Sequence, residues 1–221
     1  SEMCIRDRPL IVKSKAIPTA IEFMEREVIM DAEQFLGQSF PDNQADAYLL
    51  LKFDGNTAED IAKAYDGVAQ ICLERADAIW KTRGSFLQAI NGSTTMMDEV
   101  DVVVPRNRVN EFVEFVHALQ EEMHIRIKSF GHAGDGNLHV YILRDDLDED
   151  EWHRVLEATM EKMYAKARAM EGQVSGEHGI GFAKKPYLKE SLDPAAVAVM
   201  QGIKKAFDPN NILNPRKVCF D

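Results

Sequence analysis

The sequence is poor in cysteine, with only three in 221 residues. Cys4, Cys72 and Cys219 have neither metal-binding nor redox spacing, and such an odd, sparse set is typical of a reducing compartment without a disulfide framework. No apolar run approaches the roughly 18 residues that a transmembrane helix needs, and no signal-peptide pattern is present. These absences predict a cytoplasmic protein without a transmembrane segment.

Positive charge is also scarce, since 26 lysines and arginines face 37 acidic residues and the formal net charge is -11. This balance argues against a nucleic-acid partner, because binding to phosphates needs a basic surface. A phosphate loop is absent, and Lys184 stands where a dinucleotide fingerprint starting at Gly179 would need its third glycine. There is no Gly-x-Ser-x-Gly pattern for a covalent serine nucleophile. A local basic pocket for a small anion remains compatible with the composition.

Hydrophobic periodicity predicts alternating helices and strands along most of the chain. A capping-box pattern, Thr19-Ala20-Ile21-Glu22, predicts a first helix. Further helices are expected from about residues 57, 109, 152 and 194, and the one from 57 is expected to continue or restart toward Arg83. Predicted strands cover 47–53, 100–104, 125–130, 138–143 and a short segment at 173–175. The order predicts an α+β fold: a ferredoxin-like antiparallel sheet backed by helices, with an exposed sheet face for a site.

Two glycine-rich blocks, at 131–139 and 175–181, are the most informative part of the sequence. In the first block, His132 and His139 flank the turn signal Gly134-Asp135-Gly136-Asn137. If the flanking strands pair across this turn, the two imidazoles face each other. The alternation of side chains along a strand then places His139 and Tyr141 on the face opposite Leu138, Val140 and Ile142.

The second block adds a carboxylate and a third imidazole between glycines that allow a ligand close to the backbone. Two imidazoles and one carboxylate, from His132, His139 and Glu177, suit Zn²⁺, Mn²⁺ or Fe²⁺ with an open coordination position. His178 is then free to move protons. Spacing alone leaves a second interpretation open, in which these histidines are ordinary surface or core residues.

These residues as they stand resemble the FAD-linked oxidase family of D-2-hydroxy acid dehydrogenases. That family includes D-lactate dehydrogenases, the glycolate oxidase flavoprotein subunit and D-2-hydroxyglutarate dehydrogenase. The matching pieces are the two histidine blocks together with residues 17–24, 80–83, 101–105 and 207–215, in order along nearly the whole chain. The resemblance implies that the chain is the C-terminal substrate, or cap, domain of a flavoenzyme.

The resemblance also implies a domain organisation. Residues 1–8, which show no periodicity, would be a non-native or remnant segment. Residues 9–205 would form the substrate domain, and the tail at 206–221 would pack toward an FAD-binding domain that is absent from this chain. The chain alone is therefore expected to be inactive, and an electron-transfer flavoprotein, a quinone or a cytochrome would accept electrons from the complete enzyme. A quinone or cytochrome acceptor would allow a peripheral position at a membrane.

Carried over residue by residue, the resemblance implies roles for the site. His132, His139 and Glu177 would hold the divalent metal, and Arg83 would pair with the substrate carboxylate. His178 would accept the proton of the 2-hydroxyl while the C2 hydride passes to FAD. Asn214, in the C-terminal Leu-Asn-Pro, would lie near the flavin.

The chain departs from the relatives that act on 2-hydroxyglutarate, which carry polar and basic residues for the distal carboxylate. This sequence has Leu87 and Glu99 at those places, and neither an apolar nor an acidic side chain favours binding of a second carboxylate. The expected substrate is therefore a small 2-hydroxy monocarboxylate such as lactate or glycolate. Two alternative functions are a non-catalytic, metal-dependent module that binds hydroxy acids and a docking subunit of a flavoprotein complex.

Overall fold

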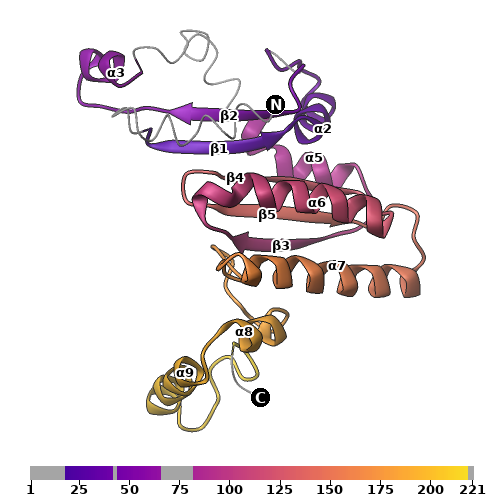
Figure 1. Ribbon diagram of the computed structural model, residues 1–221, viewed down its shortest axis with the longest axis vertical. Coiled ribbons are helices and arrows are strands. Elements are labelled where there is room, and N and C mark those ends of the chain that lie inside the picture. Colours follow the sequence, from indigo (N-terminus) through magenta and orange to yellow (C-terminus); the bar gives the residue numbers. More distant parts are fainter. Residues whose placement is uncertain (1–17, 42–43, 66–81, 219–221) are drawn as a thin grey trace.

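The computed structural model describes residues 18–41, 44–65 and 82–218, and its centre is a five-stranded antiparallel sheet (Figure 1). The order of the strands in the sheet is β2-β1-β4-β5-β3. The strands are β1 (Ala20–Glu25), β2 (Ala47–Lys52), β3 (Met97–Val103), β4 (Ile127–His132) and β5 (Asn137–Leu143). The helices are α2 (Arg26–Leu36), α3 (Ala58–Tyr65), α5 (Phe86–Gly92), the 3₁₀ turn η2 (Arg106–Arg108), α6 (Val109–Met123), α7 (Glu149–Ala169), α8 (Lys185–Ser191) and α9 (Pro194–Phe207). The predicted α+β fold is confirmed.

The segment from β3 to α7 follows the ferredoxin-like order of strand, helix, strand, strand and helix. β3 pairs with β5, β5 pairs with β4, and every pairing is antiparallel. A second β-α-β unit, β1-α2-β2, extends the sheet beyond β4. The short strand predicted at 173–175 is reduced to one bridge between Gln173 and Val103, which places that segment beside β3.

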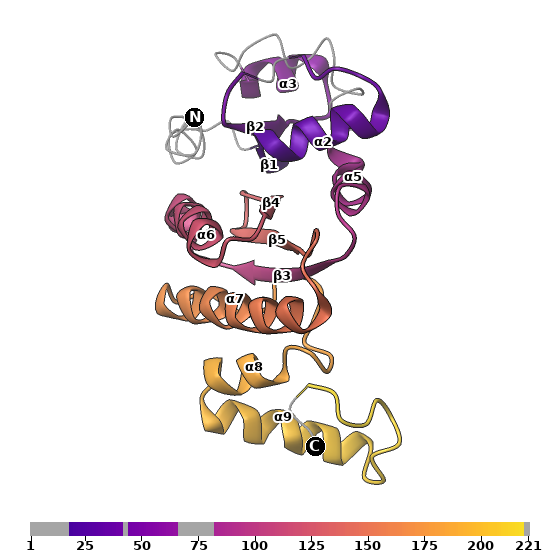
Figure 2. The same cartoon turned by 90° about the vertical axis from the view of Figure 1, so that its right-hand side faces the viewer.

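Side-chain alternation divides the apolar residues between the two faces of the sheet. Leu138, Val140 and Ile142 of β5 join the larger core under α6 and α7, whereas Tyr141 joins a smaller core with residues of α2 and α5. Figure 2 shows α6 on one side of the sheet and α5 on the other. The predicted pleat of β5 is therefore correct. The second face is partly covered by α2 and α5 rather than left open.

The predicted helix at Thr19–Glu22 is wrong, because this segment forms β1 and the helix begins at Arg26. Ile21 and Phe23 enter the core under α6, while Glu22 and Met24 point to the other face, which is the period of two of a strand. Glu22 does not return to the backbone as a capping box requires. Pairing with β2 on one side and β4 on the other outweighs the local pattern.

Most other predicted elements are present. The predicted start of the helix near Thr57 is confirmed, since the Thr57 hydroxyl accepts a hydrogen bond from the Asp60 amide just before the first turn of α3. The expected continuation through 66–81 and the segment 1–8 lie outside the described residues. In the parts of the chain that the structure describes, no helix has both the length and the apolar character needed to cross a bilayer.

The C-terminal elements form a separate layer. α8 and α9 lie beyond α7, on the side away from the sheet (Figures 1 and 2). Asp193 caps α9 by accepting a hydrogen bond from the Ala195 amide, and Pro194 occupies the first turn. None of the residues of α9 is buried. The helix is therefore held by its own capping and by few apolar contacts.

Candidate functional site

The β4–β5 hairpin brings the two predicted imidazoles together. His132 ends β4 and His139 is the third residue of β5, and their ring centroids lie 5.5 Å apart. At Gly136 of the turn φ is +89°, and a Cβ there would meet the Val104 carbonyl at 2.1 Å, so only glycine fits. The turn residues read from the sequence thus set the hairpin that positions both rings.

Glu177 completes a group of three with these histidines. One ligand atom from each residue lies within 4.8 Å of the other two. Nε2 of His132 is 3.3 Å from one Glu177 oxygen, and Nε2 of His139 is 3.8 Å from the other. Two imidazole nitrogens and a carboxylate are a donor set that suits a divalent transition metal and leaves coordination positions open. The residues present therefore fit the predicted metal.

Two further carboxylates hold the far side of each imidazole. Oε1 of Glu22 lies 2.8 Å from Nδ1 of His132, and Oε1 of Glu99 lies 2.9 Å from Nδ1 of His139. A carboxylate at Nδ1 places the ring proton there and leaves the Nε2 lone pair for a metal. The sequence did not point to Glu22, because its segment was predicted to be helical. Glu99 was predicted to affect only which substrate is accepted.

His178 lies beside this group but points its Nδ1 elsewhere. Its ring stacks on that of His139, with centroids 5.2 Å apart and 26° between the planes. Nδ1 of His178 is 3.4 Å from the same Glu99 oxygen. Glu99, His139 and His178 thus form a second group of ligand-type atoms. Because Glu99 already accepts a hydrogen bond from His139, we interpret this group as orienting the two rings.

Arg83 reaches the site from the start of the segment that leads into α5. Its Nε and Nη2 lie 3.0 and 2.8 Å from Oε2 of Glu22, and its guanidinium stacks 4.6 Å from the ring centre of Phe130. Burial raises the pKa of Glu22, but the hydrogen bond from His132 and the positive charge of Arg83 outweigh it and lower the pKa below its usual value. The predicted anion-binding arginine is therefore held next to the predicted metal ligands by an ionised carboxylate.

Asp101 fixes the loop that carries Glu177 and His178. This fully buried carboxylate accepts hydrogen bonds from the Ser175 hydroxyl, from the ammonium of Lys184 and from three consecutive backbone amides, those of residues 176–178. Burial raises the pKa of Asp101, yet these hydrogen bonds together hold it far below its usual range. Sequence analysis did not find this residue. The available signal was an acidic residue inside an otherwise apolar, β-branched strand, which needs buried partners.

The structure does not bring Asn214 to this site. Asn214 follows α9, which lies on the far side of α7 from the sheet (Figure 2). It adopts a left-handed backbone with φ of +48°, which asparagine tolerates. Its predicted contact with a flavin is therefore separate from the histidine group and stays a prediction.

A cavity of about 380 Å³ opens beside two of the predicted metal ligands, His132 and Glu177. Its walls include Thr19, Glu22, Arg106, His132, Asp135 and Glu177. The volume lies at the small end of the range typical of ligand pockets. The site can therefore admit a small molecule next to His132 and Glu177.

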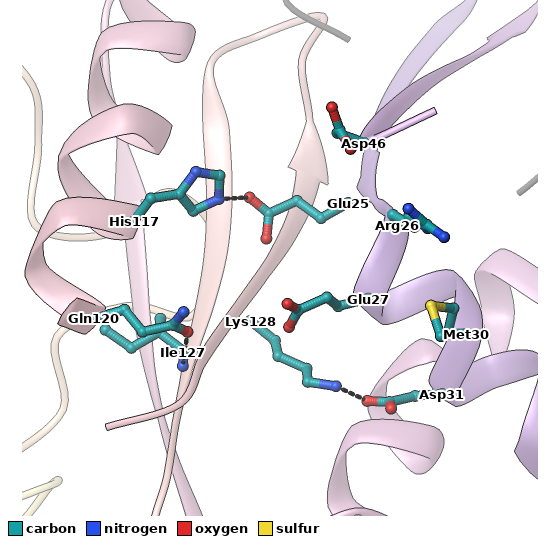
Figure 3. A pocket seen from close by; sticks show the side chains of 10 residues that line it. All are labelled: Glu25, Arg26, Glu27, Met30, Asp31, Asp46, His117, Gln120, Ile127 and Lys128. Carbon is teal, nitrogen blue, oxygen red and sulfur yellow. Dashed lines mark hydrogen bonds and ion pairs between the residues drawn. The ribbon is translucent and has the colours of Figure 1, made fainter. Parts of the chain in front are cut away.

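A larger pocket of about 540 Å³ lies between α6 and the junction of β1 with α2 (Figure 3). Four of its side chains form two pairs, His117 with Glu25 and Lys128 with Asp31. None of the predicted site residues lines it. The arrangement of chemical groups, rather than pocket size, therefore identifies the candidate site.

The pair of His117 and Glu25 in this pocket predicts pH-dependent stability. The hydrogen bond to Glu25 raises the pKa of His117, and the negative charges of Glu27 and Glu114 add to the effect. The contribution is complete below the unfolded-state pKa of about 6.5 and is lost as the pH rises through the higher folded-state pKa. Melting temperatures should show that His117→Ala costs more stability at about pH 5.5 than at about pH 9. A cost that is constant or grows with pH, or one that keeps its pH dependence in a Glu25→Gln background, would contradict this assignment.

Comparison with known proteins gives a family for this fold and this group of residues. Residues 2–218 match the family described as FAD linked oxidases, C-terminal domain. The chain is 43% identical to the D-lactate dehydrogenase of Anaerostipes hadrus, over 99% of this chain and 50% of that protein. It is 34% identical to the glycolate oxidase subunit GlcD of Bacillus subtilis, over 94% of this chain and 46% of that protein.

Other matches extend the comparison. The D-2-hydroxyglutarate dehydrogenase of Stutzerimonas stutzeri is 32% identical over 77% of this chain and 40% of that protein. A crystal structure of p-cresol methylhydroxylase with bound substrate has a similar fold, with a TM-score of 0.65 over 100% of this chain and 50% of that chain at 14% identity. The chain spans about half the length of the curated relatives that it matches. On these grounds the chain belongs to the FAD-linked oxidases, and what it contains is their C-terminal domain.

Proposed function

We propose that this chain is the substrate- and metal-binding domain of a flavin-dependent D-2-hydroxy acid dehydrogenase of the lactate or glycolate type. The observation that carries the proposal is the convergence of His132, His139 and Glu177 with His178 and Arg83 on one face of the sheet. The relatives named D-lactate dehydrogenase and glycolate oxidase subunit support the substrate class. The cytoplasm is the proposed location, in keeping with the few cysteines.

The proposed metal ligands are His132, His139 and Glu177, and the proposed ion is Zn²⁺, Mn²⁺ or Fe²⁺. A bound divalent cation would supply a Lewis acid that makes the substrate hydroxyl more acidic. Glu22 and Glu99 keep the ring proton of each ligating histidine at Nδ1. The protein's part is to present the two Nε2 atoms and a carboxylate together, and the contacts of 3.3 and 3.8 Å to the Glu177 oxygens favour that role.

The reaction needs a carboxylate anchor and a proton acceptor. Arg83 would bind the substrate carboxylate through the guanidinium hydrogens that Glu22 leaves free. His178 would take the 2-hydroxyl proton, because its side chain is nearly half exposed and stands beside the metal ligands. Loss of that proton and of the C2 hydride converts a 2-hydroxy acid into a 2-oxo acid, and the FAD would supply the hydride acceptor.

A small monocarboxylate is the proposed substrate. The Glu99 carboxylate lies against both His139 and His178, where a second substrate carboxylate would be repelled. Leu87, four residues after Arg83, is about half exposed and offers no hydrogen bond. Both features oppose a dicarboxylate such as 2-hydroxyglutarate and are compatible with lactate or glycolate.

We propose residues 9–205 as the substrate domain and 206–221 as a tail that packs against an FAD-binding domain, on the same or a separate chain. Exposed apolar side chains on α9 and the tail support this: Val199, Ile203, Phe207, Ile212 and Leu213. A patch of this kind is typical of an interaction surface, and an adjoining FAD-binding domain is the proposed occupant. Asn214 lies in this tail, and its proposed place is near the flavin. The electron acceptor would be an electron-transfer flavoprotein, a quinone or a cytochrome.

The proposed function is tested in the holoenzyme that contains this domain, by following bleaching of the flavin absorbance with a panel of 2-hydroxy acids. D-lactate or glycolate should reduce the flavin faster than D-2-hydroxyglutarate. Arg83→Met should raise KM by about 10- to 100-fold, the value of one or two charge-assisted hydrogen bonds, and leave the metal content unchanged. His178→Ala should lower kcat by about 100-fold or more. Faster turnover of 2-hydroxyglutarate would overturn the substrate class, and loss of metal on Arg83→Met would overturn its role.

Two other functions make different predictions. A binding module without redox chemistry would capture hydroxy acids equally well after His178→Ala, because binding alone needs no proton acceptor. A docking subunit would bind a separate flavoprotein without needing either histidine block. The presence of His178 together with three metal-type ligands and Arg83 favours the enzyme.

A further inference from the structure

Glu22 is a buried carboxylate that contacts two different side chains of the proposed site. Its side chain is only 8% exposed, and each of its two oxygens has a different partner. Oε1 lies 2.8 Å from Nδ1 of His132. Oε2 lies 3.0 Å from Nε and 2.8 Å from Nη2 of Arg83. One carboxylate therefore contacts both a proposed metal ligand and the proposed anchor of the substrate.

The contact with His132 determines which nitrogen can bind a metal. A carboxylate oxygen can only accept a hydrogen bond, so Nδ1 of His132 must carry the proton. The Nε2 lone pair is then directed to the side where Glu177 lies, 3.3 Å away. Loss of such a carboxylate partner typically costs about 10- to 100-fold in metal affinity. The position of Glu22 is set by β1, whose residue 22 lies opposite His132 in the register with β4.

The contact with Arg83 determines which edge of the guanidinium faces a substrate. Glu22 occupies the edge formed by Nε and Nη2, and Phe130 covers one face of the group. The hydrogens of Nη1 and the second hydrogen of Nη2 then form the edge that a substrate carboxylate can meet in a bidentate way. Arg83 thus has little rotational freedom left to lose when it binds an anion.

We propose that Glu22 is a positioning residue that ties the metal site to the substrate-binding arginine, holding His132 with one oxygen and Arg83 with the other. The proposal rests on the proposed function, because it takes His132 as a metal ligand and Arg83 as the carboxylate anchor. Glu99 has the equivalent relation on the other side of the site, where it contacts His139 and His178. The site is therefore bracketed by two carboxylates that each orient one metal ligand and one residue that handles the substrate.

The test is the dissociation constant of Zn²⁺, measured by competition with a chromophoric chelator on the 221-residue chain and its Glu22→Gln variant. Glutamine keeps the shape but removes the charge, and we expect affinity to fall by about 10- to 100-fold. The visible absorption of bound Co²⁺, which reports ligand geometry, should change in the same variant. In the holoenzyme, KM for the 2-hydroxy acid should rise as well, because Arg83 loses its partner.

Glu25→Gln is the matched control. Glu25 is on the same strand, is similarly buried and likewise pairs with a histidine at 2.8 Å, but its partner is His117 in the other pocket. This variant should bind Zn²⁺ within about twofold of the wild type, since no metal ligand is touched. An equal loss in both variants would mean a general loss of structure and would overturn the specific role of Glu22.

A further variant covers the case in which Glu22→Gln does not fold because Arg83 is left without its counter-charge. The double variant Glu22→Gln/Arg83→Met removes both charges and is compared with Arg83→Met alone. Weaker Zn²⁺ binding in the double variant supports the proposal, and equal binding overturns it. A wild-type chain that binds no Zn²⁺ would instead overturn the proposed metal site itself. Wild-type binding with an unchanged Glu22→Gln affinity would overturn only the role of Glu22.

Discussion

A chain in which alanine replaces His139 is expected to bind Zn²⁺ at least about 100-fold more weakly than the wild type. This loss exceeds the one expected when only a residue that hydrogen-bonds to a metal ligand is removed. His139 is 5% exposed and presents Nε2 to Glu177 while Glu99 holds its Nδ1. Removing it takes away one of the three proposed ligands and leaves a buried gap beside the other two. Titration calorimetry with Zn²⁺ and elemental analysis of the purified chain measure the effect.

The matched control is His153→Ala. His153 is 69% exposed on α7 and belongs to neither group of ligand-type atoms. It should change neither the metal content nor the affinity. If His139→Ala retained the metal while its melting temperature stayed near that of the wild type, the ligand assignment would be wrong.

The second large effect is expected at Asp101. Asp101→Ala should lower the free energy of unfolding by about 3–5 kcal/mol, because it leaves Lys184 and several amides without their buried acceptor. The same change should weaken metal binding, since Glu177 lies in the loop that Asp101 holds. Urea unfolding monitored by fluorescence measures the first effect, and competition for Zn²⁺ measures the second.

The pH dependence of this effect has a definite sign. The pKa of Asp101 is lowered in the folded state, so its contribution is present above the ordinary aspartate value near 4 and is lost as the pH falls through the folded value. The difference between wild type and Asp101→Ala should therefore shrink in acid. Asp98→Ala, at an exposed position on the same strand, should cost about 0.5 kcal/mol or less. An equal cost at both positions would refute the anchoring role.

The hairpin at the centre of the site could be predicted because its signals are local. The glycines of the 133–136 turn and the alternation from Leu138 to Ile142 specify a strand pair and its pleat, and both are as expected. The helix predicted from Thr19-Ala20-Ile21-Glu22 is wrong, because a Thr-x-x-Glu pattern is equally compatible with a strand whose alternate residues are buried. Only pairing with β2 and β4 decides between the two.

The sequence by itself determined the α+β class, the histidine hairpin and the resemblance to the FAD-linked oxidases, because periodicity, turn residues and motif identity lie within short stretches of chain. Only the tertiary structure showed that Glu22 contacts His132, 110 residues away, and that Asp101 accepts hydrogen bonds from three backbone amides of the loop carrying Glu177. These contacts arise where distant strands and a loop meet. No local pattern encodes which buried carboxylate will face which donor, since that is set by strand order and register.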